Sequence, residues 1–128
     1  METFTKSELE VMQVLWHHGP LKPGDLEAEF PRPIGNAALR SLLLILLEKG
    51  HVAREKDGRA FVYRAVTRRD GELKKLTRRL ADIFSDGSPK ALIAQMVRAE
   101  KLSEEDLREL QAIARGTKDE PTAKEKRS

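Results

Sequence analysis

The chain has 128 residues, of which 39% are hydrophobic and none is cysteine, with 24 Lys and Arg against 21 Asp and Glu. A chain of this length forms one domain, or one domain with an accessory piece, and buries enough surface for a modest core. The lack of cysteine excludes disulfides, zinc-thiolate clusters and thiol catalysis. The sequence has no apolar run of the roughly 18 residues that span a bilayer, and its N-terminus lacks the pattern of a signal peptide. We therefore expect a cytoplasmic protein without membrane insertion.

The positive charge is concentrated in the middle of the chain. Residues 1–31 carry a net charge of −4, residues 32–79 carry +8 and residues 80–128 carry −1. A basic segment of this kind is typical of a surface that binds a polyanion such as nucleic acid, because each Lys or Arg near a phosphate releases a condensed counterion. Chance clustering on a solvated surface is the alternative interpretation.

Helical periodicity predicts three helices in the first fifty residues. A Thr-x-x-Glu capping box, Thr5 with Glu8, precedes the first helix, and Gly and Pro residues separate the helices. The predicted helices run from about Lys6 to His18, from Pro23 to just before Pro31, and between Gly35 and Gly50.

The period then changes from 3.6 to 2 residues, which predicts a β-hairpin. Its first strand begins at Val52, Asp57-Gly58 forms the turn, and the return strand covers Arg59 to Val66. Three helices followed by a basic hairpin are typical of a winged helix. In that fold the third helix enters the major groove of DNA and the hairpin flanks it on the backbone. The predicted fold class is therefore mainly α with a small β-hairpin.

Three amphipathic helices are predicted in the remainder of the chain. They begin after Thr67, which can cap with Asp70, at Ser88-Pro89 and at Ser103. So small a piece cannot enclose its own apolar stripes, which favours a twofold dimer, although the helices could instead fold back onto the winged helix in a monomer. The expected dimer contacts are Leu73, Leu76, Leu80, Phe84, Leu92, Met96, Leu107 and Leu110. We thus predict a winged-helix domain over residues 1–66, a helical dimerisation region over 67–115 and a disordered tail over 116–128.

The start of the third predicted helix carries side chains suited to reading DNA bases. Asn and Arg can form paired hydrogen bonds with base edges, and an Ala methyl can contact a thymine methyl. The expected base-contacting residues are Asn36, Ala37, Arg40 and Ser41. The basic residues of the hairpin suit phosphates better, and these are Arg54, Lys56, Arg59 and Arg64. The alternative interpretation is an ordinary solvated helix face.

The sequence offers no pattern for catalysis. The three histidines, His17, His18 and His51, lack the spacing of two zinc ligands on a helix, and we interpret them as structural or surface residues. Single glycines stand at helix and turn boundaries rather than in a phosphate-binding loop. We therefore expect no enzyme activity, no metal and no cofactor.

Three segments resemble one known family. They are TKSELEVMQVLW at residues 5–16, LLEKGHV at residues 46–52 and KDGRAFVY at residues 56–63. In this order they resemble the penicillinase repressor family of BlaI/MecI type, over about residues 3–114. The resemblance implies a homodimeric bacterial transcriptional repressor with a winged helix on a palindromic operator and a C-terminal dimerisation region. It also implies a partner, a membrane sensor-protease that cleaves the repressor.

The chain departs from the family pattern at several positions. Asn36-Ala37-Ala38 replaces a threonine-rich start of the recognition helix, and Leu44 and Leu47 stand where relatives often carry charge. Gln95-Met96 stands where well-known members have an Asn-Phe scissile bond, and the cysteines of copper-responsive relatives are absent. A second hypothesis is therefore a winged helix that serves as a protein-interaction module and buries Leu44 against a partner.

Overall fold

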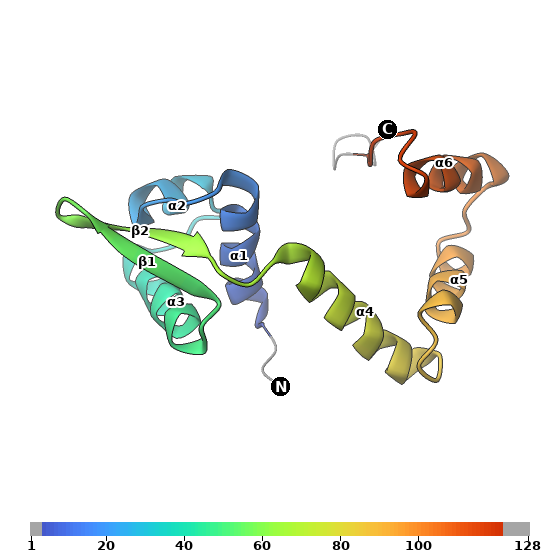
Figure 1. Cartoon of the computed structure of the whole chain (residues 1–128), viewed down its shortest axis with the longest axis horizontal. Helices are drawn as coiled ribbons and strands as arrows, with labels where there is room; N and C mark the ends of the chain where they lie inside the picture. Colours follow the sequence, from blue (N-terminus) through green and yellow to red (C-terminus); the bar gives the residue numbers. More distant parts are fainter. Residues whose placement is uncertain (1–3, 122–128) are drawn as a thin grey trace. The chain divides into compact units, whose positions relative to one another are not determined.

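The computed structural model describes residues 4–121, which form six helices and one two-stranded antiparallel sheet in the predicted order (Figure 1). The predicted fold class is confirmed. The chain divides into two compact units between Leu76 and Thr77, inside the fourth helix, whereas the boundary predicted from sequence follows residue 66. The elements are α1 (Lys6–His18), α2 (Pro23–Glu29), α3 (Asn36–Lys49), β1 (Val52–Asp57), β2 (Ala60–Ala65), α4 (Arg69–Phe84), α5 (Pro89–Ala99) and α6 (Glu104–Ala114).

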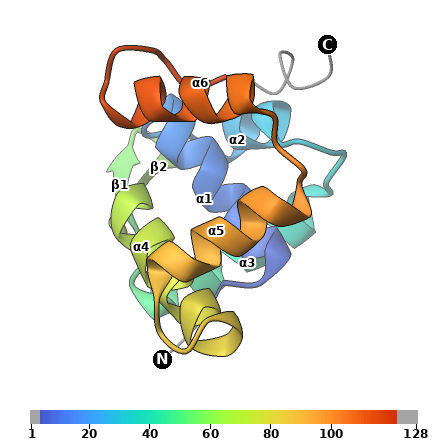
Figure 2. The ribbon, with the colours of Figure 1, turned by 90° about the vertical axis from the view of Figure 1, so that its right-hand side faces the viewer.

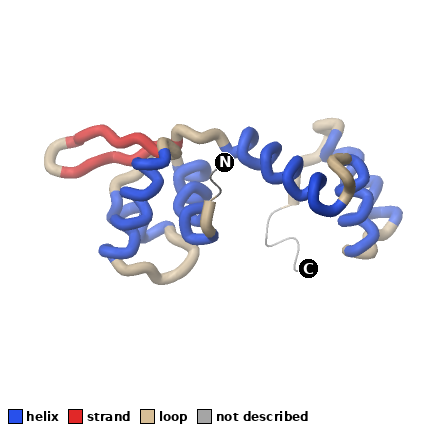
Figure 3. Tube along the Cα trace, turned by 90° about the horizontal axis from the view of Figure 1, so that it is seen from below, coloured by secondary structure: helices blue, strands red, loops and turns tan. Residues whose placement is uncertain are grey.

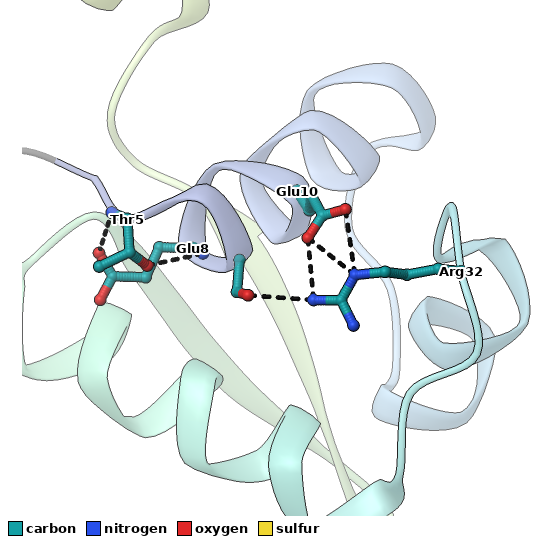
Figure 4. Close-up of polar contacts among 5 residues, drawn as sticks. Thr5, Glu8, Glu10 and Arg32 are labelled. Atoms are coloured by element: carbon teal, nitrogen blue, oxygen red, sulfur yellow. Dashed lines mark hydrogen bonds and ion pairs between the residues drawn. The ribbon is translucent and has the colours of Figure 1, made fainter.

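Local signals set the ends of α1 and α3. The Glu8 backbone N–H donates to Thr5 Oγ1 at 3.2 Å, and the Thr5 N–H donates to Glu8 Oε1 at 2.9 Å, so the predicted capping box is confirmed (Figure 4). Gly50 ends α3 with a φ of 80°, the left-handed conformation that glycine adopts at little cost. The start of α1 and the end of α3 are therefore set by caps, which satisfy the backbone groups that have no hydrogen-bond partner within the helix.

The core of the N-terminal unit lies among α1, α2, α3 and the hairpin. Its fully or almost fully buried side chains come from all three helices, and Val52 and Tyr63 of the hairpin join them. The helical members are Val11, Met12, Leu15, Leu26, Leu39, Leu43 and Leu46. Burial of each large side chain contributes about 1.5–3 kcal/mol. This packing orients α3, because its apolar stripe points into the core and its opposite face is exposed.

The hairpin, whose two strands are red in Figure 3, has a fixed register. Arg54 pairs with Tyr63, and Asp57 pairs with Ala60, so the two loop residues are Gly58 and Arg59. The predicted turn at Asp57-Gly58 was wrong by one residue. Asp57 stays in the strand, and Gly58, with a φ of 65°, takes the first loop position instead.

The connection from β2 to α4 is held by α1 and by the loop after α3. The Trp16 indole N–H donates to the Thr67 carbonyl oxygen at 2.8 Å, and Thr67 Oγ1 lies 2.7 Å from His51 Nδ1. The predicted Thr67 cap was therefore wrong, because α4 begins at Arg69 and the Thr67 hydroxyl has a partner distant in sequence. The histidine at position 51 is a structural residue of this connection.

The C-terminal unit consists of short capped helices (Figure 2). Ser88 accepts a hydrogen bond from the Ala91 N–H at the start of α5, and Ser103 forms a capping box with Asp106 at the start of α6. Beyond Leu76, only Ala81 and Leu92 are buried among the described apolar residues. The helices thus have well-defined ends and almost no shared core.

The predicted tail over residues 116–128 lies partly outside the described residues, which end at 121. In the described part, the Thr117 N–H and hydroxyl both donate to the Ala112 carbonyl oxygen, and Lys118 pairs with Glu109 at 3.5 Å. Residues up to Lys118 therefore cap α6. Among residues 4–121, no helix is both long and apolar enough to cross a membrane.

Candidate nucleic-acid interface

The outer face of α3 brings the predicted base-contacting residues together. All four are exposed and lie on the first two turns of the helix, and they are Asn36, Ala37, Arg40 and Ser41. Leu39 and Leu43 of the same helix are fully buried. The core therefore fixes which way this polar face points.

Two of these side chains orient each other. Arg40 Nε donates to Asn36 Oδ1 at 2.7 Å, across the four-residue spacing that places side chains on the same helix face. Within residues 4–121 the structure shows no further side-chain hydrogen bond for either residue. The Arg40 Nη groups and the Asn36 amide N–H donors therefore remain available to a ligand, and the bond restricts the positions that they sample.

The basic residues predicted on the hairpin do not share one face. Cross-strand pairing places Arg54 and Lys56 on one side of the sheet and Arg64 on the other, while Arg59 lies in the loop. Arg54 already has partners, because its guanidinium lies 4.1 Å from the Phe61 ring centroid and its Nη1 donates to Tyr63 Oη at 3.1 Å. Lys56 and Arg59 near the tip, and Arg64 on the other side, are exposed and accessible to a phosphate.

A buried ion pair joins α1 to the last turn of α3. Glu8 is only 3% exposed, and its carboxylate accepts hydrogen bonds from Lys49 Nζ at 3.1 and 3.2 Å. Burial works to raise the pKa of the Glu8 carboxyl, but hydrogen bonds from the Thr5 backbone and from Lys49, with the Lys49 charge, outweigh it and lower the pKa. The ionised pair therefore fastens α3 to the core.

Arg32 is a positioning residue that sequence reasoning missed. It lies between two prolines in the segment that leads into α3, and its guanidinium donates to both carboxylate oxygens of Glu10 at 3.0–3.3 Å (Figure 4). Its Nη2 also donates to Ser7 Oγ at 3.0 Å. Its partners Glu10 and Ser7 lie 22 and 25 residues away in the sequence, so they form no local pattern with it. The only signal in the sequence is an arginine flanked by prolines.

The other candidate ligands do not converge. Among residues 4–121, no group of three His, Asp or Glu side chains is arranged to hold a metal ion. His17 and His18 are exposed at the end of α1, where His18 lies 3.3 Å from Glu29. An open hollow of about 360 Å³ is lined by Gln13, Trp16, His17 and Arg69.

The two leucines that depart from the family pattern differ in burial. Leu47 is half-buried and packs against the core, whereas Leu44 is 51% exposed on the outer side of α3. Its neighbour Ile45 is also exposed. Leu47 is therefore a core residue, and Leu44 and Ile45 form a small apolar surface beyond the polar face.

Most residues predicted for the dimer interface are exposed. The exposed members are Leu73, Leu76, Phe84, Met96, Leu107 and Leu110. Leu80 is half-buried and Leu92 is only 5% exposed, so Leu92 is buried within the chain and cannot lie at an outward contact in this conformation. Two further exposed residues, Ile83 and Ile93, belong to the same set of helices and were not predicted.

Comparisons with known proteins give one family. The family described as Penicillinase repressor matches residues 4–115. The penicillinase repressor of Bacillus licheniformis is 26% identical over 109 residues, covering 84% of this chain and 85% of that protein. The methicillin resistance regulatory protein MecI of Mammaliicoccus sciuri is 24% identical, covering 85% and 90%.

Solved structures with a similar fold include two with TM-scores of 0.50 and 0.52. The structure of a MarR family protein from Bacillus stearothermophilus aligns with a TM-score of 0.50 and 20% identity, covering 81% of this chain and 76% of that chain. The fold and the family match agree with the resemblance seen in the sequence. This chain belongs to the penicillinase repressor family.

Proposed function

We propose that this chain is a transcriptional repressor that acts in the cytoplasm as a homodimer on a palindromic operator. One observation carries the proposal: Asn36, Arg40 and Ser41 form an exposed polar face on α3. The buried stripe behind them holds that face rigid. The family match and the winged-helix fold support the same function.

The chemistry of this face suits the major groove. The Arg40 guanidinium can donate two hydrogen bonds to a guanine, and the Asn36 amide can pair with an adenine edge. The Ala37 methyl can contact a thymine methyl. On the hairpin, Lys56 and Arg59 provide exposed charge for phosphates, which adds affinity without sequence information.

The proposed homodimer follows from the apolar surface of the C-terminal helices. Phe84, at 62% exposed, and Met96, at 53%, are among several large apolar side chains that face outward there. So many exposed apolar side chains mark an interaction surface. A twofold symmetric homodimer is the commonest closed assembly that covers such a surface. A dimer presents two α3 helices, and we expect half-sites separated by about 34 Å or a multiple of it.

The experiment selects bound fragments from genomic DNA and then measures affinity for the selected operator and for random duplex. Arg40→Ala is expected to cost about 1–3 kcal/mol on the operator and to relax specificity at one position. Arg59→Ala serves as the control, because it removes a cation that binds phosphate and weakens both duplexes alike. Equal losses on both duplexes for Arg40→Ala would refute its role in reading bases.

Relief of repression by a membrane sensor-protease is a further part of the proposal. The family resemblance implies cleavage, and the corresponding bond, Gln95-Met96, lies inside α5. Gln95 Nε2 donates to the Phe84 carbonyl oxygen at 3.1 Å, so the bond is part of folded structure. Cleavage therefore requires local opening of α5, and mapping of fragments after co-expression with a neighbouring membrane protease tests it.

A second candidate function rests on the small apolar surface of α3. Leu44 and Ile45 are exposed, which favours a winged helix that binds another protein. A salt titration separates the two functions. DNA binding falls by about 0.9 log units per log unit of salt for each phosphate neutralised, whereas an apolar interface barely responds.

A further inference from the structure

A row of four cations lies on α4, outside the surfaces assigned to DNA bases, to the hairpin and to the dimer. All four side chains are exposed. We call this row the α4 basic stripe, and its members are Lys74, Lys75, Arg78 and Arg79. It belongs to the basic middle segment of the chain, and the proposed function does not use it.

Helical spacing places the stripe on one side of α4. Lys74 and Arg78 are four residues apart, as are Lys75 and Arg79, so each pair lies on the same face one turn apart. Three leucines of the helix, Leu73, Leu76 and Leu80, follow a different row. At about 100° per residue that row lies on roughly the opposite side of the helix. A dimer formed through the apolar row therefore leaves the basic stripe exposed.

None of the four stripe cations forms an ion pair with a described residue, although Asp82 lies one turn after Arg78 on α4. Among residues 4–121, no carboxylate lies within ion-pair distance of any of the four cations. The nearby acid Asp70 pairs with Arg69 at 3.6 Å instead. Like charges four residues apart repel and destabilise an isolated helix. An anionic partner along the stripe would remove that repulsion.

We propose that the α4 basic stripe binds the sugar-phosphate backbone of duplex DNA and adds sequence-independent affinity to the contacts of α3 and the hairpin. This inference rests on the proposed function. DNA is favoured over an anionic membrane, because membrane binding would use the apolar row of the same helix, which includes Leu73, Leu76 and Leu80. The dimer needs that row. Moreover, only Val66, Thr67 and Arg68 separate the stripe's helix from β2 of the hairpin.

The test uses the full-length protein with four glutamines in the stripe, since glutamine keeps helix propensity and removes charge. The substitutions are Lys74→Gln, Lys75→Gln, Arg78→Gln and Arg79→Gln. The matched control removes four exposed cations from α5, α6 and the C-cap of α6, through Lys90→Gln, Arg98→Gln, Arg108→Gln and Arg115→Gln. For each protein, affinity for the operator and for random duplex is measured over a range of salt, and sedimentation gives the oligomeric state.

The stripe variant is expected to remain a dimer and to bind both duplexes more weakly by the same factor. Its plot of log affinity against log salt becomes shallower by about 0.9 for each phosphate that the variant no longer neutralises, while the control keeps the parent slope. Equal slopes for the stripe variant and the control overturn the inference. So does a stripe variant that loses binding to phosphatidylserine vesicles but keeps DNA binding.

The inference and the proposed function fail in distinguishable ways. If the parent protein binds no duplex, the proposed function fails and the inference fails with it. Only the inference fails if three results occur together. The parent binds its operator, Arg40→Ala removes specificity, and the stripe variant binds DNA as tightly as the parent.

Discussion

The two units of the chain use amphipathic helices differently. In the N-terminal unit, eleven apolar side chains from three helices and the hairpin form one buried cluster. In the C-terminal unit, Ala81 and Leu92 are the only described apolar residues that are buried, and Ile83 and Phe84 are more than 60% exposed. The same periodicity thus gives a closed core in one unit and an open apolar surface in the other. An apolar stripe on a helix predicts that this face is buried. It does not indicate whether the face packs against the same chain or against a second molecule.

The largest expected effect tests the closed core. Leu39→Ala removes a fully buried side chain of α3 and is expected to lower the free energy of unfolding of the N-terminal unit by about 2–5 kcal/mol. Because its neighbours belong to the same chain, the loss does not depend on protein concentration. Urea unfolding at two protein concentrations, tenfold apart, measures the loss of stability and its dependence on protein concentration.

The control for this prediction is Leu110→Ala in α6, where the leucine is 43% exposed. In a monomer this change has little effect, whereas in the proposed dimer its effect depends on concentration. A concentration-dependent loss for Leu39→Ala would contradict the assignment of a self-contained core.

The next effect tests the open surface. Phe84→Ala removes the large aromatic group at the end of α4 and is expected to weaken dimer association by about 2 kcal/mol or more. Sedimentation over a range of concentrations measures it. Leu44→Ala, which removes a similarly exposed side chain on α3, is expected to leave the dimer unchanged. Equal dimer affinity for the Phe84 variant and the parent would remove α4 from the interface.

Features with local causes were predictable from the sequence. The bounds of α1 agree with the prediction because its capping box lies within four residues, and α3 ends at Gly50 because glycine takes the left-handed conformation. The exposed polar residues at the start of α3 were also predictable, because helical periodicity is a local feature. Once Leu39 and Leu43 are assigned to the core, helical geometry leaves Arg40 outside.

Features with distant partners were not predictable. Thr67 looks like a helix cap in the sequence, but Trp16 and His51 bind it across 51 and 16 residues. Arg32 reads as a loop arginine, yet Glu10 fixes its guanidinium. Contacts across such separations depend on tertiary packing, which periodicity does not encode.

A smaller effect tests how α3 is attached to the core. The lowered pKa of Glu8 means that its ionised form stabilises the folded state. That contribution is fully present above the pKa of the unfolded carboxyl, about 4.3, and is lost as pH falls through the lower folded-state pKa. Glu8→Gln is expected to lower the free energy of unfolding by about 1.5–3 kcal/mol at pH 7. The variant should also lose less stability than the parent as the pH falls.

Urea unfolding between pH 7 and pH 3 checks this prediction. Lys49→Gln removes the other half of the ion pair, and the double variant is expected to lose less than the sum of the single losses. Additive losses would show that Glu8 and Lys49 act independently.

The smallest effect concerns the segment that leads into α3. Arg32→Lys keeps the charge but removes the three guanidinium hydrogen bonds to Glu10 and the bond to Ser7, and it is expected to cost about 0.2–1 kcal/mol of stability. Because this segment sets where α3 begins, the variant is also expected to discriminate less well between operator and random duplex. Glu10→Gln breaks the same pair from the other side, so the two changes together should cost no more than either alone. Additive losses would show that Arg32 and Glu10 act independently in stability. An Arg32→Lys variant that weakens both duplexes equally would instead assign Arg32 to direct phosphate binding.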